Sequence, residues 1–136
     1  MPSHIFIAED EESIVSLLKY NLEKEGYKVS TADNGEDALK LIKDKNPDLI
    51  LMDWMMPNLS GIEISKQLKK DKKFNDIPII MLTAKGEEED KLKAFDVGTD
   101  DYVTKPFSQK ELNARIKSIL RRSKPQSSSD VVEFND

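Results

Sequence analysis

The stretch Asp48-Leu-Ile-Leu-Met-Asp-Trp-Met-Met-Pro57 decides how the rest of the chain can fold. Its run of apolar residues, Leu49 to Met52, predicts a β-strand that is buried on both faces of a sheet. Asp53 ends this run, and Pro57 prevents the strand from continuing. Open α/β sheets bind ligands at the carboxyl ends of their strands, so Asp53 lies where a functional group is expected. The alternative is that Asp53 simply begins a loop, as Asp often does.

Further predicted strands and helices surround this stretch. Short apolar runs that favour strands lie at residues 4–8, 27–32, 77–82 and 101–104, and the alternating run at 27–32 suits a place near a sheet edge. Apolar residues at helical spacing follow the strands, at 14–22, 38–42, 60–70, 87–97 and 108–122. Five strand–helix repeats with short connections predict an α/β fold, a doubly wound five-stranded parallel sheet with five helices.

Several helix ends are marked by capping residues. Asn34 is a typical N-cap, and the pairs Ser60–Glu63 and Ser108–Glu111 have the capping-box pattern. Gly26 is the expected C-terminal cap of the first helix. The apolar residues at helical spacing in that helix are Ile14, Leu17, Leu18 and Leu22.

Composition narrows the class of protein. Of the 136 residues, 38% are hydrophobic and 35% are charged, which suits a globular domain with charged helix surfaces. The formal net charge of −5, from 21 basic and 26 acidic residues, argues against nucleic-acid binding by this segment. The chain has no cysteine, and no stretch approaches the ~18 apolar residues of a membrane span. We therefore expect a cytoplasmic protein without membrane contact.

The sequence divides near residue 122. Residues 1–122 are long enough for one domain with its own core. Ser123–Ser129 has the composition of a polar linker. Apolar residues return at Val131–Phe134, so we expect residues 123–136 to be a linker followed by the truncated start of a second domain.

The ends of four predicted strands present polar side chains: Glu9 and Asp10, then Asp53, Thr83 and Lys105. Three carboxylates held close together repel one another, and a hard divalent cation such as Mg²⁺ would relieve this repulsion. A lysine ammonium and a threonine hydroxyl beside them suit a site that stabilises phosphoryl oxygens next to a nucleophilic carboxylate. The alternative interpretation is a structural salt-bridge cluster.

These residues resemble the motifs of a known family. Glu9-Asp10, Met52–Pro57, Gly61, Thr83-Ala84 and Lys105–Phe107 match, in order and spacing, the receiver domains of bacterial two-component response regulators of the OmpR/PhoB type. The resemblance covers residues 4–122 and implies a CheY-like, flavodoxin-like fold with strand order 2-1-3-4-5. The residues after 122 resemble the linker and the start of the winged-helix DNA-binding domain of these transcription factors.

The resemblance assigns roles in phosphoryl transfer. It implies that Asp53 accepts a phosphoryl group from a partner sensor histidine kinase. Asp10, Asp53 and the backbone carbonyl of Met55 would bind Mg²⁺, and Glu9 would contribute through water. The chain would not be an enzyme beyond catalysing its own phosphorylation and slow dephosphorylation.

The resemblance also implies a switch. Thr83 and Lys105 would each bind an oxygen of the phosphoryl group on Asp53. Tyr102 occupies the aromatic switch position and would become buried when Thr83 moves inward. This change would alter dimerisation and thereby DNA binding by the missing output domain.

A dimer face is predicted on the helix at 87–97, the strand at 101–104 and the last helix. Leu92 and Phe95 are three residues apart and therefore share one face of the predicted helix. A face that only contacts solvent would carry charged residues at these positions instead. Opposite charges are split between the helix and strand at 87–104 and the last helix, which suits a two-fold homodimer. The resemblance implies contacts such as Lys91–Glu111 and Asp101–Arg115 between copies. The predicted face comprises Lys91, Leu92, Phe95, Asp96, Asp100, Asp101, Glu111, Ala114, Arg115, Lys117 and Arg122.

Three other functions fit the sequence less well. A haloacid-dehalogenase-like phosphatase also uses a strand-end Asp with Mg²⁺, but it needs a second Asp two residues later, where this chain has Met55. A flavodoxin-like electron carrier needs a hydroxyl-rich loop after the first strand, whereas Glu9–Glu12 would repel a flavin phosphate. A stand-alone receiver that acts through protein contacts alone is disfavoured by the apolar residues after the linker.

Overall fold

The computed structural model describes residues 2–54, 56, 59–84, 100–105 and 107–123. It shows five strands, which are β1 (His4–Ala8), β2 (Lys28–Ala32), β3 (Leu49–Asp53), β4 (Ile79–Ala84) and β5 (Asp101–Lys105). The described helices are α1 (Glu12–Lys24), α2 (Gly35–Lys45), α3 (Gly61–Lys70) and α5 (Gln109–Ser123). The predicted helix at 87–97 and the predicted linker and second domain lie outside the described residues, apart from Ser123 at the end of α5.

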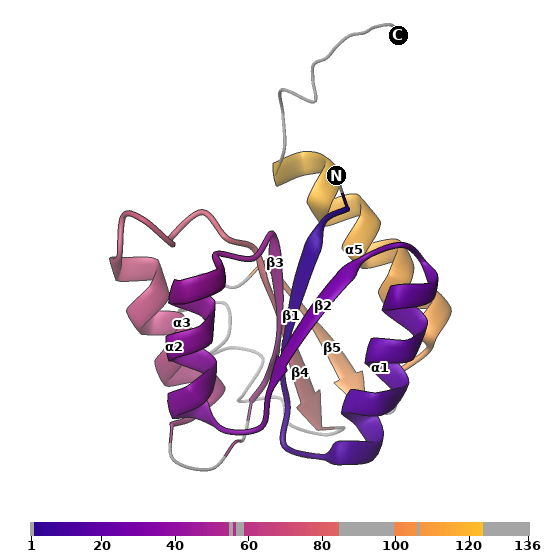
Figure 1. Ribbon diagram of the computed structural model, residues 1–136, viewed down its shortest axis with the longest axis horizontal. Coiled ribbons are helices and arrows are strands. Elements are labelled where there is room, and N and C mark those ends of the chain that lie inside the picture. Colours follow the sequence, from indigo (N-terminus) through magenta and orange to yellow (C-terminus); the bar gives the residue numbers. More distant parts are fainter. Residues whose placement is uncertain (1, 55, 57–58, 85–99, 106, 124–136) are drawn as a thin grey trace, which may run out of the picture.

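The strands form one parallel sheet in the order β2-β1-β3-β4-β5, which confirms the predicted topology. The continuous apolar run Leu49–Met52 predicted a buried strand, and all of β3 is buried, including Asp53, which was expected to leave the core. The alternating strand β2 lies at the edge of the sheet, also as predicted. In Figure 1 the arrowheads of β4 and β5 lie at the end of the sheet opposite the C-terminal end of α5.

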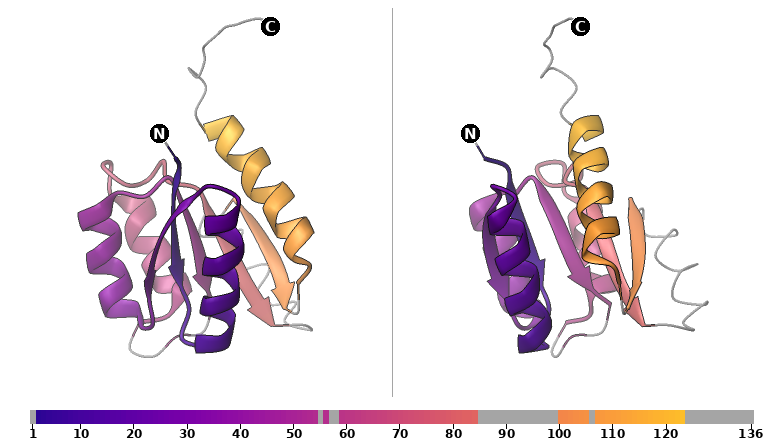
Figure 2. Two further views of the ribbon diagram at one scale, coloured as in Figure 1. Left: turned by 45° about the vertical axis from the view of Figure 1, so that its right-hand side comes forward. Right: turned by 90° about the vertical axis from the view of Figure 1, so that its right-hand side faces the viewer.

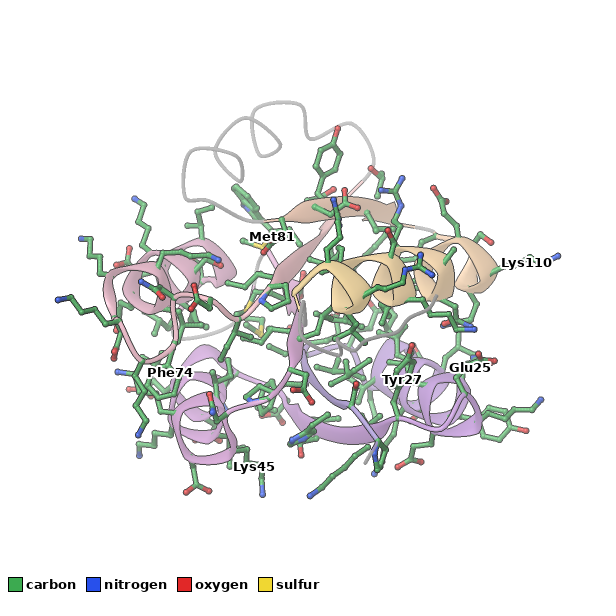
Figure 3. All side chains as sticks on the ribbon, turned by 90° about the horizontal axis from the view of Figure 1, so that it is seen from above. Glu25, Tyr27, Lys45, Phe74, Met81 and Lys110 are labelled. Atoms are coloured by element: carbon green, nitrogen blue, oxygen red, sulfur yellow. The ribbon has the colours of Figure 1, made fainter. Side chains whose placement is uncertain are left out.

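Helices cover both faces of the sheet, which makes the doubly wound arrangement (Figure 2). The face toward α1 and α5 buries one apolar cluster that includes Ile7, Leu51 and Val103. The face toward α2 and α3 buries a second cluster that includes Met52 and Trp54. Figure 3 shows the side chains filling the space between the sheet and the helices on either side. Successive side chains along a strand therefore lie in different clusters, because they point to opposite faces of the sheet.

The predicted N-terminal caps are confirmed, whereas the C-cap of α1 is Glu25, one residue before the predicted Gly26. Asn34 Oδ1 accepts a hydrogen bond from the backbone N–H of Asp37 at 2.9 Å. Ser60 Oγ accepts from Glu63 N, and Ser108 Oγ accepts from Glu111 N, both at 3.3 Å. Gly26 follows α1 with a φ of +95°, a left-handed conformation that suits glycine. These local bonds fix where α2, α3 and α5 begin.

Two expectations differ from the structure. Leu17 was grouped with the apolar face of the first helix, but its side chain is 56% exposed because Leu18 and Leu22 face the core instead. The fourth strand begins at Ile79 and continues to Ala84, whereas the sequence predicted 77–82. Pairing with β5 extends β4 at its end, since Thr83 and Ala84 pair with Thr104 and Lys105. Among the described helices, none has both the length and the apolar character needed to cross a membrane.

Candidate functional site

Strand register brings the predicted site residues to one edge of the sheet. Ala8 of β1 pairs with Met52 of β3, so the next residues in each chain segment, Glu9 and Asp53, emerge side by side. Asp53 pairs with Leu82 of β4, and Thr83 is the next residue of that strand. The pairing of β4 with β5 then places Lys105 at the end of the adjacent strand. The carboxyl ends of four neighbouring strands thus supply the polar groups, where open α/β sheets hold their ligands.

Three carboxylates lie together at this edge. One oxygen from each of Glu9, Asp10 and Asp53 lies within 4.8 Å of the others. Glu9 and Asp53 are buried, with 1% and 6% of their surfaces exposed, whereas Asp10 is exposed. A cavity lined by Glu9, Asp10 and Asp33 begins beside the cluster. Two of the three carboxylates that repel one another are therefore shielded from water, and the cluster is open to solvent at Asp10.

The donors in this cluster fit a hard divalent cation. All three are carboxylate oxygens, the ligand type that Mg²⁺ prefers, and a cation between them would offset their mutual repulsion. The exposed Asp10 leaves room for the water molecules that Mg²⁺ retains. Met55, whose carbonyl was a predicted ligand, lies outside the described residues.

Lys105 supplies the positive charge of the site. Its Nζ lies 3.0 Å from Glu9 Oε1 and 3.4 Å from Asp53 Oδ1. These two carboxylates raise the pKa of the Lys105 ammonium, although burial acts in the opposite direction. Lys105 therefore stays charged and partly neutralises the cluster.

Burial raises the pKa of Asp53 to about 7, and the Glu9 carboxylate adds to this effect while Lys105 opposes it. The folded chain therefore binds more protons at Asp53 than the unfolded chain does between pH about 4 and about 7. Charging Asp53 in this range weakens the folded state as pH rises. This cost is absent below pH 4 and complete above pH 7.

Without divalent cations, we expect Asp53→Asn to raise the free energy of unfolding by about 1–3 kcal/mol at pH 8, because it removes this buried charge. At pH 4 the two proteins should be nearly equal, since Asp53 is then protonated in the folded chain. Urea unfolding of both proteins at pH 4 and pH 8 measures the difference. An Asn variant that is less stable than the parent at pH 8 would contradict the assignment of a repulsive site.

Thr83 and Tyr102 share the other face of the sheet. Thr83 has the same strand parity as Met81, whose side chain belongs to the cluster under α2 and α3. Tyr102 pairs with Met81 across β4 and β5 and packs against that same cluster. Thr83 is fully buried, and its Oγ1 has no hydrogen-bond partner among the described residues. A buried hydroxyl without a partner is costly unless a ligand satisfies it.

The sequence did not predict the contacts that Gly61 makes. Gly61 begins α3, and its N–H donates to the carbonyl of Trp54 at 3.0 Å. A Cβ at this position would lie 2.2 Å from the carbonyl oxygen of Asp53. The start of α3 therefore packs directly on the backbone of the predicted acceptor, a contact that only a residue without a side chain permits. The signal available in the sequence was a glycine immediately after an N-cap serine.

Three charged residues of the predicted dimer face, Asp101, Glu111 and Arg115, already have partners within the chain. Arg115 Nη1 lies 2.6 Å from Asp101 Oδ2, and its Nη2 lies 3.0 Å from Glu111 Oε2. Ala114 is exposed on α5. The structure thus brings β5 and α5 together through Arg115.

Two other residues of the predicted dimer face contact parts of the chain away from Arg115. Lys117 lies 3.5 Å from Glu25, at the end of α1. Asp100 accepts a hydrogen bond from the backbone N–H of Ile79 at 2.8 Å, and it lines a cavity with the exposed Arg122. Lys91, Leu92, Phe95 and Asp96 lie outside the described residues.

The fold and the acidic site with its lysine point to one class of protein. Comparison of the sequence with known protein families identifies the same class. Residues 5–117 match the response regulator receiver domain family. The chain belongs to this family. The match covers the five strands of the sheet except His4, the first residue of β1, and it covers most of α5.

Among named relatives, the chain is similar to two transcriptional regulatory proteins. It is 56% identical over 123 residues to the alkaline phosphatase synthesis transcriptional regulatory protein PhoP of Bacillus subtilis, covering 90% of this chain and 50% of that protein. It is 44% identical over 134 residues to the phosphate regulon transcriptional regulatory protein PhoB of Escherichia coli, covering 98% and 58%. The chain therefore spans little more than half the length of these relatives.

Solved structures agree with this family. The receiver domain of the Francisella response regulator 1452 has a TM-score of 0.82 and 37% identity, covering 89% of this chain and 98% of that one. The chemotaxis protein CheY4 of Vibrio cholerae has a TM-score of 0.82 and 28% identity, covering 88% and 99%. These similarities confirm the predicted CheY-like fold.

Proposed function

We propose that this chain is the receiver part of a two-component response regulator that controls transcription, and that Asp53 accepts a phosphoryl group from a sensor histidine kinase. The observation that carries the proposal is the buried Asp53 carboxylate, which has an oxygen within 4.8 Å of two other carboxylates and lies 3.4 Å from the Lys105 ammonium. A structural ion-pair cluster would balance its charges, whereas among the described residues this one has an excess of negative charge and a Thr83 hydroxyl without a hydrogen-bond partner. Both features suit a site that awaits a cation and a phosphoryl group.

The proposed transfer is a displacement at phosphorus. A carboxylate oxygen of Asp53 attacks the phosphorus atom of a phosphohistidine, and the new O–P bond replaces the P–N bond. The electron pair of that bond remains on the histidine nitrogen, which leaves as neutral imidazole when the other ring nitrogen carries a proton. Lys105 and Thr83 can then bind two of the phosphoryl oxygens, which carry the charge of the transition state.

Asp10 and Asp53, with the Met55 carbonyl that the resemblance implies, would hold Mg²⁺. Bound there, the cation would neutralise charge on the phosphoryl oxygens and let them approach the carboxylates. Asp10 is suited to this role because it is the exposed member of the cluster. Mg²⁺ affinity should be modest, since few of its ligands come from protein.

Chelation tests this part of the proposal. Treatment with acetyl phosphate should phosphorylate the chain in the presence of Mg²⁺, and EDTA should slow the reaction by about tenfold or more. Asp10→Asn should need a Mg²⁺ concentration at least about tenfold higher, because it removes one charged ligand. The exposed Glu63→Gln on α3 is a matched control for the loss of one acidic charge. Labelling that is indifferent to EDTA would exclude a metal-dependent acceptor.

The proposed switch couples Thr83 to Tyr102. Both residues lie on the same face of adjacent strands, one diagonal step apart. When Thr83 Oγ1 turns to a phosphoryl oxygen, it vacates space that Tyr102 can enter. The bonds formed only in the phosphorylated state shift the population between the two packings.

We also propose that phosphorylation strengthens a homodimer through β5, α5 and the predicted helix at 87–97, and that the dimer positions a DNA-binding domain beyond residue 136. The support is the resemblance and the similarity to transcriptional regulators about twice as long. The intrachain contacts of Arg115 mean that Asp101 and Glu111 would share this arginine with any charge from the second copy. Exposed ion pairs are weak, so they would determine how the two copies are aligned more than how tightly the copies bind.

Ala114→Arg tests the dimer without disturbing an intrachain ion pair, because Ala114 is exposed and small. With a phosphoryl mimic bound, this variant should dimerise about tenfold more weakly, since a bulky charge would enter the centre of the interface. Sedimentation equilibrium measures the association. Tyr20→Arg on α1, where the side chain is 63% exposed, is the control. Equal weakening by both variants would place the interface elsewhere.

A further inference from the structure

The nearer carboxylate partner of Lys105 is Glu9, and not the proposed acceptor. Lys105 Nζ lies 3.0 Å from Glu9 Oε1 but 3.4 Å from Asp53 Oδ1. The Glu9 side chain is 0% exposed, against 8% for Asp53. Because water screens a buried pair less, the attraction between Glu9 and Lys105 is strong for its distance.

Glu9 is held in this position by its own contacts. Its Oε2 accepts a hydrogen bond from the backbone N–H of Glu11 at 3.1 Å. Its backbone N–H donates to the carbonyl of Ala32 at 3.1 Å, which fixes the start of the turn after β1. One carboxylate oxygen is thus bound to the turn before α1, and the other lies against Lys105. Shortening the side chain by one methylene would prevent it from keeping both contacts.

From these contacts we infer that Glu9 is a positioning residue that competes with the phosphoryl group on Asp53 for the Lys105 ammonium. The inference rests on the proposed function of Asp53. A phosphoryl group adds about two negative charges and three acceptor oxygens beside Lys105. A bond from Lys105 to one of these oxygens weakens or replaces its contact with Glu9. Glu9 therefore favours the unphosphorylated state.

This competition predicts opposite effects on two ligands. The negative charge of Glu9 attracts a divalent cation to the cluster, so removing it should weaken Mg²⁺ binding. The same charge repels a phosphoryl group and occupies its lysine, so removing it should strengthen binding of a phosphoryl mimic. A residue that only assisted the metal through water would weaken both when removed.

Calorimetric titration of the whole chain separates these cases. Mg²⁺ is titrated first, and fluoroberyllate, a mimic of the phosphoryl group on a carboxylate, is titrated at saturating Mg²⁺. In Glu9→Gln we expect Mg²⁺ affinity to fall about threefold to tenfold and fluoroberyllate affinity to rise by a similar factor. Glu12→Gln removes the same charge from an exposed position in the first turn of α1 and should leave fluoroberyllate affinity unchanged.

Glu9→Asp separates the effect of the carboxylate charge from the effect of the side-chain length. It keeps the carboxylate near the cation but withdraws it from Lys105, so fluoroberyllate affinity should rise while Mg²⁺ affinity stays within about twofold of the parent. Fluoroberyllate binding by Glu9→Gln and Glu9→Asp that is no tighter than that of the parent would overturn the inference. A parent chain that binds Mg²⁺ but no fluoroberyllate would instead contradict the proposed function of Asp53.

Discussion

Asp53→Ala is expected to take up no phosphoryl group from acetyl phosphate or from a histidine kinase. Asp53 is the one residue of the cluster that ends the central strand β3 and contacts Lys105 while lying next to both Glu9 and Asp10. The loss should be complete within detection, about 100-fold or more, because the substitution removes the nucleophile itself. Intact-protein mass spectrometry after a fixed reaction time measures uptake.

Two controls make this result specific. Asp33→Ala removes an exposed carboxylate at the rim of the neighbouring cavity and should leave phosphorylation within about twofold of the parent, since only long-range charge changes. Asp53→Glu keeps a carboxylate but displaces it by one methylene, and a misplacement of this size strongly slows an oriented reaction. If Asp53→Ala were phosphorylated to the same extent as the parent, another residue would be the acceptor.

Gly61→Ala is expected to lower the free energy of unfolding by about 2–4 kcal/mol, and the midpoint of thermal unfolding by on the order of 10 °C. The new Cβ would lie 2.2 Å from the Asp53 carbonyl oxygen and 2.9 Å from Met52 Cγ. The backbone oxygen cannot yield as the end of a flexible side chain can, so α3 must move away from β3. The hydrogen bond from Gly61 N to the Trp54 carbonyl would lengthen at the same time.

Gly26→Ala is the matched control for this prediction. A Cβ at Gly26 meets no atom of the described residues within 4 Å, and the cost there comes from the φ of +95°, about 1 kcal/mol. Circular dichroism melts of both variants and the parent decide the comparison. Equal destabilisation by the two substitutions would mean that helix packing against Asp53 does not require glycine. The phosphorylation rate of Gly61→Ala should also fall, since its clash is with the acceptor residue.

The sequence allowed the sheet and its functional edge to be predicted because the relevant signals are local. The apolar run before Asp53 identifies a strand buried on both faces, and the polar residues that follow each run lie at one edge whenever the strands are parallel. The N-caps Asn34, Ser60 and Ser108 bond to residues three positions later, so they could be read without tertiary information.

Features that depend on how distant elements pack could not be predicted in the same way. Leu17 and Leu18 are both apolar, and only the direction from which the sheet approaches α1 decides which is buried. The contact between Lys105 and Glu9 joins β5 to β1 across two intervening strands, so its distance depends on the whole sheet. The contact of Arg115 with Asp101 depends likewise on how α5 lies against β5.

Locating the phosphoryl group in the parent protein tests directly whether Asp53 is the acceptor. The chain is treated with acetyl phosphate and Mg²⁺, reduced with borohydride to mark acyl phosphates, digested and sequenced by mass spectrometry. We expect one modified carboxylate, Asp53, and at least about tenfold less modification when EDTA is present. A modification at Glu9, at Asp10 or at a residue outside the cluster, with Asp53 unchanged, would contradict it.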